Sequence, residues 1–287
     1  MLRRFCIVAI PGLALAVCGV AVAQSPIQSY DASYDVRLVD ASTGTGPRAA
    51  TGTLDLRLAE TCAGWETRSR VIMDLAFRDG TTLTNERVFR STESRDGRNY
   101  EFAVQTVKGG VLVEAFKGSA KLSKRAGTVN YELPSDDPEA KPRRIQVPLP
   151  RGTLLPVAYM KELTDRAEKG DALFRSVVFN GAASTGPRTL SALITPRSAR
   201  ANSPAPSDDI DSALLSQPAW DLSLAFFNIF ERRDIPNFEV FQSYHASGIT
   251  PFFEQEFEDF RIAADLRRLK ALSAPTCEQS SAKQPKS

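Results

Sequence analysis

Histidine is the residue that this sequence has least of, because His245 is the only one among 287 residues. A metal site built on several histidines is therefore excluded, and any Ser-His-Asp arrangement would have to use this single side chain. The residues around His245 alternate as in a β-strand, which favours a structural histidine with a polar neighbour. We expect no catalytic residue, no metal site and no cofactor.

An excess of charge of one sign is also missing. The chain has 36 Lys and Arg residues against 34 Asp and Glu residues. Two of the basic residues, Arg3 and Arg4, lie in the leader described next, so the rest of the chain is formally neutral. This balance argues against a nucleic-acid partner and against a strongly charged membrane surface.

The first 23 residues have the pattern of a secretory signal peptide. Arg3 and Arg4 precede an apolar run over residues 5–22, and the small residues Ala21 and Ala23 come directly before Gln24. This arrangement is typical of a cleaved leader, so we expect a periplasmic protein whose mature chain has no transmembrane segment.

Two other interpretations of the leader are open. Cys18 would be the first, acylated residue of a lipoprotein, but the residue before such a cysteine is normally small and here it is Val17. A retained membrane anchor is disfavoured because Pro11 and Gly12 interrupt a run that is barely long enough to span a bilayer.

Cysteine is scarce too, and the positions of the four cysteines are informative. Cys6 and Cys18 lie in the leader, whereas Cys62 and Cys277 lie near opposite ends of the remaining chain. In an oxidising compartment such a pair most simply forms a disulfide, which would stabilise the fold by up to roughly 5 kcal/mol for so long a loop. The alternative is two unpaired buried thiols.

Apolar and polar residues alternate along most of the chain from Tyr30 onward, which predicts half-buried antiparallel strands. Short glycine-containing turns separate these runs and supply the positive φ that tight hairpins require. We therefore expect an all-β fold made of consecutive hairpins, with turns at Asp79-Gly80, Asp96-Gly97, Gly109-Gly110 and Ala126-Gly127.

One helix is predicted over residues 154–169, with Thr153 as its cap, Pro156 in its first turn and Gly170 after its end. Residues 196–218 are rich in Pro, Ser, Ala and Asp, which predicts a mobile loop, either a flap over an opening or an exposed excursion. We expect a single domain over residues 24–277, followed by a disordered tail over residues 278–287.

Several segments in this order and spacing resemble the EipB-like family of alphaproteobacterial periplasmic proteins, long known only as a domain of unknown function. The resemblance covers nearly the whole mature chain. It is carried by residues 64–74, 93–102, 152–156, 178–181 and 266–277.

This resemblance implies an antiparallel β-spiral, or open β-barrel, with one or two short helices, similar to the barrels of periplasmic lipoprotein carriers. It also implies one disulfide, here Cys62 with Cys277, and a role in cell envelope integrity without established catalytic residues. The sequence departs from the family in Asn180, where an aspartate is expected, and in the longer loop at residues 196–218.

The first functional hypothesis is a non-catalytic periplasmic protein that supports envelope integrity, either through a protein partner or by holding a lipid or other hydrophobic ligand. Aromatic residues of the last strands either line a ligand cavity or form an ordinary packed core. They are Phe226, Phe227, Phe230, Phe252, Phe253 and Phe257.

Two alternatives remain. A periplasmic hydrolase acting on cell-wall or lipid material would use carboxylates from Glu254, Glu256, Glu258 and Asp259, although a solvated acidic face is the simpler explanation. An interaction platform would use Trp220 and the loop at residues 196–218 as a docking edge.

Overall fold

The computed structural model describes residues 27–42, 46–135, 140–197, 208–231, 235–257 and 259–277. The predicted signal peptide, the predicted tail and Glu258 lie outside this part of the chain. Within it, fourteen strands form one antiparallel sheet in the order β8-β7-β6-β5-β4-β3-β2-β1-β14-β13-β12-β11-β10-β9. Two meanders, β1 to β8 and β9 to β14, therefore join where β1 pairs with β14.

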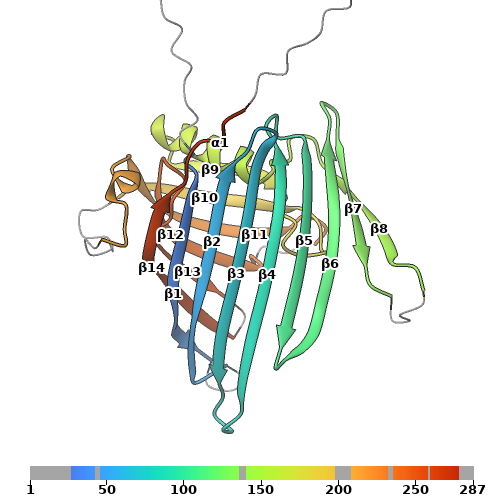
Figure 1. The fold of residues 1–287 in the computed structure, drawn as a ribbon. Coiled ribbons are helices and arrows are strands. Elements are labelled where there is room, and N and C mark those ends of the chain that lie inside the picture. The colour runs from blue at the N-terminus through green and yellow to red at the C-terminus, as the bar shows by residue number, and fades with distance from the viewer. Residues whose placement is uncertain are drawn as a thin grey trace, which may run out of the picture.

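The sheet curls, so that the strands of the second meander run behind those of the first (Figure 1). Its edge strands, β8 and β9, do not pair with one another, and the expected open antiparallel fold is thereby confirmed. The strands are β1 (Tyr30–Ala41), β2 (Ala49–Glu60), β3 (Gly64–Ala76), β4 (Thr82–Ser94), β5 (Asn99–Lys108), β6 (Val111–Leu122), β7 (Gly127–Leu133), β8 (Arg143–Leu149), β9 (Leu173–Val178), β10 (Arg188–Pro196), β11 (Ala219–Asn228), β12 (Phe238–His245), β13 (Phe252–Glu256) and β14 (Phe260–Ala271).

Alternation explains why these segments form strands with one buried face. In β5, buried residues alternate with exposed ones, and the same period recurs in β1 and β7. Three of the four predicted turns have the expected positive φ, at Gly80, Gly97, Gly109 and Gly110, whereas Gly127 lacks it and is the first residue of β7. Inward-facing side chains are thus separated from outward-facing ones along the whole sheet.

Helix α1 spans Pro156–Glu168, close to the predicted range. Thr153 is not its cap, because Leu155 holds that position and makes no capping hydrogen bond with its side chain. The Thr153 hydroxyl instead donates to the Pro150 carbonyl oxygen at 2.7 Å, which closes the turn before the helix.

Three clusters of buried side chains fill the inner side of the curled sheet. The first involves β1–β3 and β14, the second β5–β8, and the third β9–β12. The helix region contributes to all three, through Val157, Leu155 and Leu163 respectively. Helix α1 therefore joins the two meanders across the inner face.

The segment over residues 179–187, here called the inner segment, packs against the second cluster. The Tyr100 hydroxyl donates to the Asn180 carbonyl oxygen at 2.7 Å, and the Tyr131 hydroxyl accepts from the Gly186 N–H at 3.2 Å. Gly181 has φ +66°, and a Cβ atom there would lie 2.5 Å from the Phe102 ring. Only glycine allows this close approach, which brings the chain onto the aromatic side chains of the sheet.

The segment before α1 covers the free edge of β9. The Leu154 N–H donates to the Val177 carbonyl oxygen at 2.8 Å, and its carbonyl oxygen accepts from the Phe179 N–H at 2.9 Å. This single bridge satisfies backbone groups that an edge strand would otherwise expose.

Prolines limit the free edge of β8. Pro148 has no N–H, and in antiparallel strands alternate residues direct their backbone groups to the same side. The outward positions are consequently Arg144 and Gln146, with Pro142 before them and Pro148 after them. Only a short stretch of this edge can pair with another strand.

Part of the segment predicted as a loop over residues 196–218 is ordered and packed. Residues 198–207 lie outside the described chain, but Ser212–Leu215 form a short 3-10 helix, η1. Ile210 bridges Leu269 of β14, and the Ser247 hydroxyl donates to the Leu214 carbonyl oxygen at 2.9 Å. Leu214 also packs against the first cluster, so residues 208–218 are attached to the body of the fold although most of their side chains are exposed.

A buried carboxylate attaches helix α1 to the sheet. Glu93 of β4 is only 5% exposed, and its two oxygens accept from the Val157 N–H at 2.7 Å and the Ala158 N–H at 3.0 Å. Burial raises the pKa of Glu93, while the two N–H donors and the charge of Lys161 oppose that shift. Glu93 therefore accepts hydrogen bonds from the first N–H groups of α1, as a capping side chain at position 155 would otherwise do.

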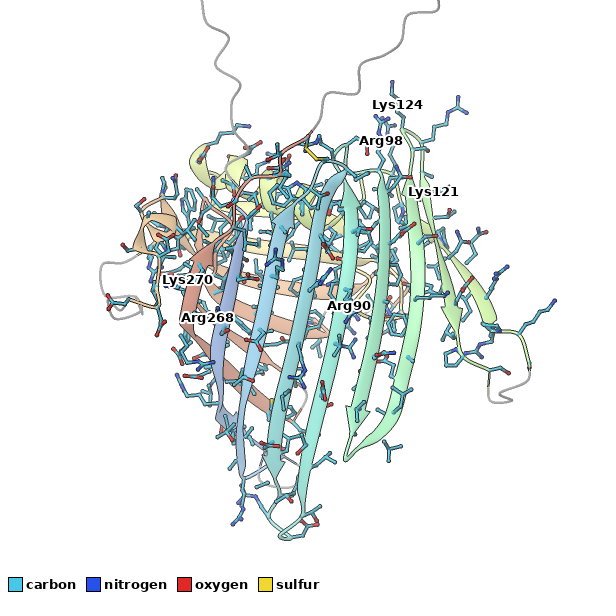
Figure 2. All side chains as sticks on the ribbon, viewed as in Figure 1. Arg90, Arg98, Lys121, Lys124, Arg268 and Lys270 are labelled. Carbon is cyan, nitrogen blue, oxygen red and sulfur yellow. A yellow bond between two sulfur atoms is a disulfide. The ribbon has the colours of Figure 1, made fainter. Side chains whose placement is uncertain are left out.

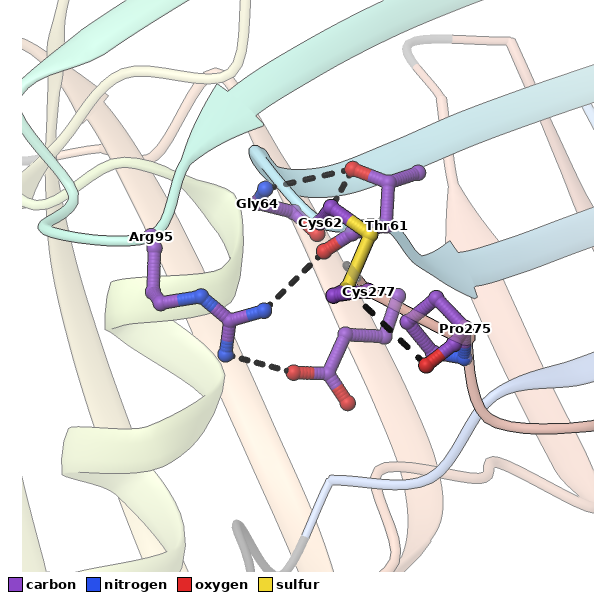
Figure 3. The surroundings of a disulfide bond; sticks show 7 residues. Thr61, Cys62, Gly64, Arg95, Pro275 and Cys277 are labelled. Carbon is purple, nitrogen blue, oxygen red and sulfur yellow. Dashed lines mark hydrogen bonds and ion pairs between the residues drawn. A yellow bond between two sulfur atoms is a disulfide. The ribbon is translucent and has the colours of Figure 1, made fainter. Parts of the chain in front are cut away.

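A disulfide joins the β2–β3 turn to the end of the described chain (Figure 3). The Cys62 and Cys277 sulfur atoms lie 2.05 Å apart, and their Cα atoms lie 5.6 Å apart. The Arg95 guanidinium supports this turn by donating to Glu60 at 2.8 Å and to the Thr61 carbonyl oxygen at 3.0 Å. The residues after β14 are thereby held against the first meander.

We expect Glu93→Ala to lower the free energy of unfolding by about 2 to 3 kcal/mol, because two buried N–H groups lose a charged acceptor. Glu93→Gln should also destabilise, since one of its two terminal atoms cannot accept. Urea unfolding measures both effects. Glu101→Ala, on the outward face of β5, is the matched control and should change stability by less than about 0.5 kcal/mol. A Glu93→Ala variant as stable as this control would contradict the anchoring role.

We expect Cys62→Ser or Cys277→Ser to lower the melting temperature under oxidising conditions, with a loss of stability of up to about 5 kcal/mol. The reason is that the reduced unfolded chain regains the freedom of a long loop. Reductant should lower the wild-type melting temperature in the same way and leave both variants unchanged. Equal melting temperatures in all these samples would show that the bond contributes nothing to stability.

Candidate functional site

His245, the only histidine, occupies a structural position at the end of β12. It is 7% exposed, with Nδ1 3.2 Å from the Gln217 carbonyl oxygen and Nε2 3.3 Å from an Arg197 nitrogen. Burial lowers the pKa of His245, and the charge of Arg197 acts in the same direction. Both ring nitrogens face structural partners, so the ring is not positioned as the base of a serine nucleophile.

The acidic residues considered for a hydrolase do not form a group on one strand. β13 ends at Glu256, and Glu258 lies outside the described residues. Glu254 lies 3.7 Å from Arg261, and the hollow that it lines together with Glu256 measures only about 180 Å³. The Asp259 carbonyl oxygen accepts from the Ser42 N–H at 2.8 Å. The arrangement is that of an ion-paired outer surface.

The six phenylalanines, for which a cavity lining and an ordinary core were the two alternatives, are dispersed. Phe226 stacks on Phe238 with ring centroids 4.5 Å apart, and Phe252 is buried. Phe230 and Phe257 are exposed, and the neighbours Phe227 and Phe253 fall on the opposite strand faces from Phe226 and Phe252. An ordinary core explains the buried members.

Trp220, considered as a docking residue, is partly buried and packs against the third cluster. It lies on β11 opposite Pro196 of β10 and Tyr244 of β12. Trp220 therefore contributes to the packing of the third cluster. Trp65 is buried as well, beneath the Lys161 ammonium at 5.7 Å from the ring centroid.

A hollow lies on the outward face of strands β3 to β8, and we call it the outer groove. Its volume is about 680 Å³, and a second hollow of about 370 Å³ shares Arg90, Ala103, Lys117 and Glu132 with it. The groove forms where β7 and β8 diverge from the first half of β6, because β6 pairs with β7 only over residues 117–122.

Two cross-strand rows of outward side chains line the outer groove, and strand register brings them together. The first row is Arg90, Ala103, Lys117, Glu132 and Arg144. The second row is Glu66, Thr92, Glu101, Ser119, Asn130 and Gln146. The small side chain of Ala103 leaves space between Arg90 and Lys117.

Glu132 joins two cations of the groove. Its carboxylate oxygens lie 3.2 Å from Lys117 Nζ and 3.0 Å from an Arg144 nitrogen. The hydrogen bond from Lys117 is the main cause of the lowered pKa of Glu132, and the charges of both cations add to it. This carboxylate is accordingly occupied and leaves Arg90 to other partners.

Arg90 stands out in the groove because, within the described chain, its side chain has neither a hydrogen bond nor an ion pair. It lies on the sheet face turned to the viewer in Figure 2. Arg57 of β2 and Arg68 of β3 stand in the same row as Arg90. Arg57 lies opposite Arg68, and Arg68 lies opposite Arg90. Like charges opposite one another destabilise a sheet, so this row favours an anionic ligand.

Arg57 and Arg68 each have a carboxylate partner, unlike Arg90. Arg57 lies 2.7 Å from Asp31, and Arg68 lies 2.6 Å from Glu66. A guanidinium that is exposed, unpaired and directed into a groove is suited to bidentate binding of a carboxylate or phosphate. Alternation along each strand could have predicted these outward residues, but their row requires the register.

No group of three or more His, Cys, Asp or Glu side chains in the described chain could hold a metal ion. None of the helices that the structure describes is long and apolar enough to cross a membrane.

Comparison with known proteins gives one consistent result. A family model described as EipB-like matches residues 21–273. The cell envelope integrity protein EipB of Brucella abortus (strain 2308) is 23% identical over 257 residues, which cover 88% of this chain and 87% of that protein. A crystal structure from Brucella abortus, described as a β-barrel-like protein of a domain of unknown function, matches with a TM-score of 0.75 at 20% identity, covering 86% of this chain and 99% of the other.

We expect acid to weaken this fold through His245. Its pKa is lowered in the folded state, so the related stability is present above the unfolded pKa of about 6.5 and is lost as the pH falls below that value. Between about pH 7.5 and about pH 5.5 the melting temperature should fall by a few degrees more in wild type than in His245→Gln. Parallel melting curves for the two proteins would contradict this assignment.

Proposed function

Because this chain belongs to the EipB-like family, we propose that it is exported to the periplasm and supports cell envelope integrity by binding another envelope protein in the outer groove, without catalysing a reaction. The name of the Brucella relative supports the envelope role. The observation that carries the binding role is the unpaired Arg90 in a groove of about 680 Å³.

The groove suits an extended acidic segment of a partner protein. Its first row runs across β4 to β8, and neighbouring strands are about 4.8 Å apart, so a segment of several residues would cross it. Arg90 would bind a carboxylate of that segment, and the Lys117–Glu132–Arg144 group would fix its position. The uncharged members of the second row, Thr92, Ser119, Asn130 and Gln146, would supply hydrogen bonds along one side.

A hydrophobic ligand inside the spiral is the weaker candidate. The inner face is occupied by three clusters of the protein's own side chains and by the inner segment. Native mass spectrometry of the periplasmic protein separates the two candidates. A stoichiometric mass that organic solvent releases as lipid would favour ligand carriage over partner binding.

We expect Arg90→Glu to lower capture of the partner by about tenfold or more, because a charged hydrogen bond is replaced by repulsion. A photo-crosslinking residue at Ala103 should capture a periplasmic protein in cells, and Arg90→Glu should remove that product. Cells that carry only Arg90→Glu should also become sensitive to detergent.

Arg268→Glu is the matched control, because Arg268 is an exposed cation on the outward face of β14, far from the groove in the sheet order. It should leave crosslinking and detergent resistance unchanged. Full resistance in Arg90→Glu cells, with no crosslinked product at Ala103, would overturn the proposal.

A further inference from the structure

Five cations gather at the end of the sheet where helix α1 lies, and we call them the basic rim. They come from three successive connections: Arg98 from the β4–β5 turn, Lys121, Lys124 and Arg125 from the β6–β7 hairpin, and Arg151 from the turn before α1. All five are exposed. Arg98, Lys121 and Lys124 lie close together in Figure 2.

Backbone pairing holds the three connections side by side. The Leu122 N–H donates to the Arg98 carbonyl oxygen at 2.8 Å, and Gly127 of β7 is opposite Leu149 of β8. The Ser123 hydroxyl closes the hairpin tip by donating to the Ala126 carbonyl oxygen at 2.6 Å. The cations are therefore presented by an ordered end of the fold.

Carboxylates do not neutralise the basic rim within the described structure. None of its five members has an ion pair with a described carboxylate, and the one acid in the same turns is Asp96. Asp96 accepts from the Ser94 hydroxyl at 2.6 Å and from the Arg98 N–H at 3.1 Å. A chain with almost balanced total charge thus has a local excess of positive charge in these three connections.

We propose that the basic rim attaches the protein to a membrane surface rich in anionic phospholipid. Four of the five cations lie in neighbouring turns and Lys121 lies next to the end of β6, and neither hollow of the outer groove is lined by any of them. They suit a plane of phosphate groups better than a single anion or a peptide in a cleft. Each basic residue near such a surface strengthens binding by about fivefold.

The attachment is electrostatic and does not involve insertion. The large apolar side chains that are exposed in the described chain lie elsewhere, with Val111, Leu112 and Val113 at the far end of β6. Binding should consequently weaken steeply with salt, since such attraction extends only about 10 Å at moderate ionic strength.

The test is flotation of the full exported protein with vesicles. At low salt, the protein should float with phosphatidylcholine vesicles that contain phosphatidylglycerol and not with pure phosphatidylcholine vesicles. Lys121→Glu/Lys124→Glu should weaken binding by about 25-fold or more. Arg268→Glu/Lys270→Glu is the control, with the same change of charge on the outward face of β14, and should retain binding.

Three outcomes would overturn the proposal: absence of flotation with the anionic vesicles, equal losses in the two double variants, or competition by inorganic phosphate beyond that of sodium chloride at equal ionic strength. The last would indicate a discrete phosphate site. Arg90→Glu should float normally, so this test distinguishes failure of the proposed partner binding in the outer groove from failure of the proposed membrane attachment through the basic rim. Unchanged melting temperatures in both double variants exclude unfolding as the cause.

Discussion

A sheet of fourteen strands that curls without closing must bury one apolar face and protect two edge strands from pairing with other chains. The rest of this structure depends on how these two requirements are met. The inner face is filled by the chain itself, with α1 contributing to the first and third clusters, Leu155 just before it to the second, and the inner segment packed on Phe102 and Tyr131. Each edge ends differently. Leu154 pairs with β9, whereas prolines border the open positions of β8. Binding surfaces are consequently confined to the outward face and to the turns.

Glu93 links these elements, because it is the point at which the sheet holds the helix. A buried ionised carboxylate is costly unless donors surround it, and here the first N–H groups of α1 supply them. The neighbouring strand must also approach closely, since a Cβ atom on Gly64 would lie 2.0 Å from the Glu93 carbonyl oxygen. A turn that carries one half of the disulfide precedes Gly64. The disulfide at Cys62, just before β3, and the attachment of α1 by Glu93 of β4 are therefore adjacent in the sheet.

Local pattern predicted the local structure well, and contacts distant in sequence account for the rest. Period-two alternation and glycine turns depend on neighbouring residues, and they predicted the hairpins of the first meander. Pro156 and Gly170, near the two ends of α1, are equally local signals, and they predicted the helix. The pairing of β1 with β14 joins the two ends of the domain, and no local signal specifies it. The same limit applies to the groove. Arg90, Lys117 and Arg144 are ordinary exposed residues in sequence, and only register makes them one row.

Net charge has a related limit, because a sum over the chain does not describe where the charges lie. Balanced composition argued against a charged membrane surface, yet the turns at one end gather cations while many carboxylates are paired on the outward faces of the strands. The rim and the groove are also neighbours, since Ser119 and Lys121 are two residues apart on the same face of β6, about 7 Å along the strand. A protein attached through the rim would hold its strands away from the bilayer and present the groove sideways, just above the lipid surface. Such a geometry favours partners with acidic segments close to the membrane over partners that diffuse freely in the periplasm.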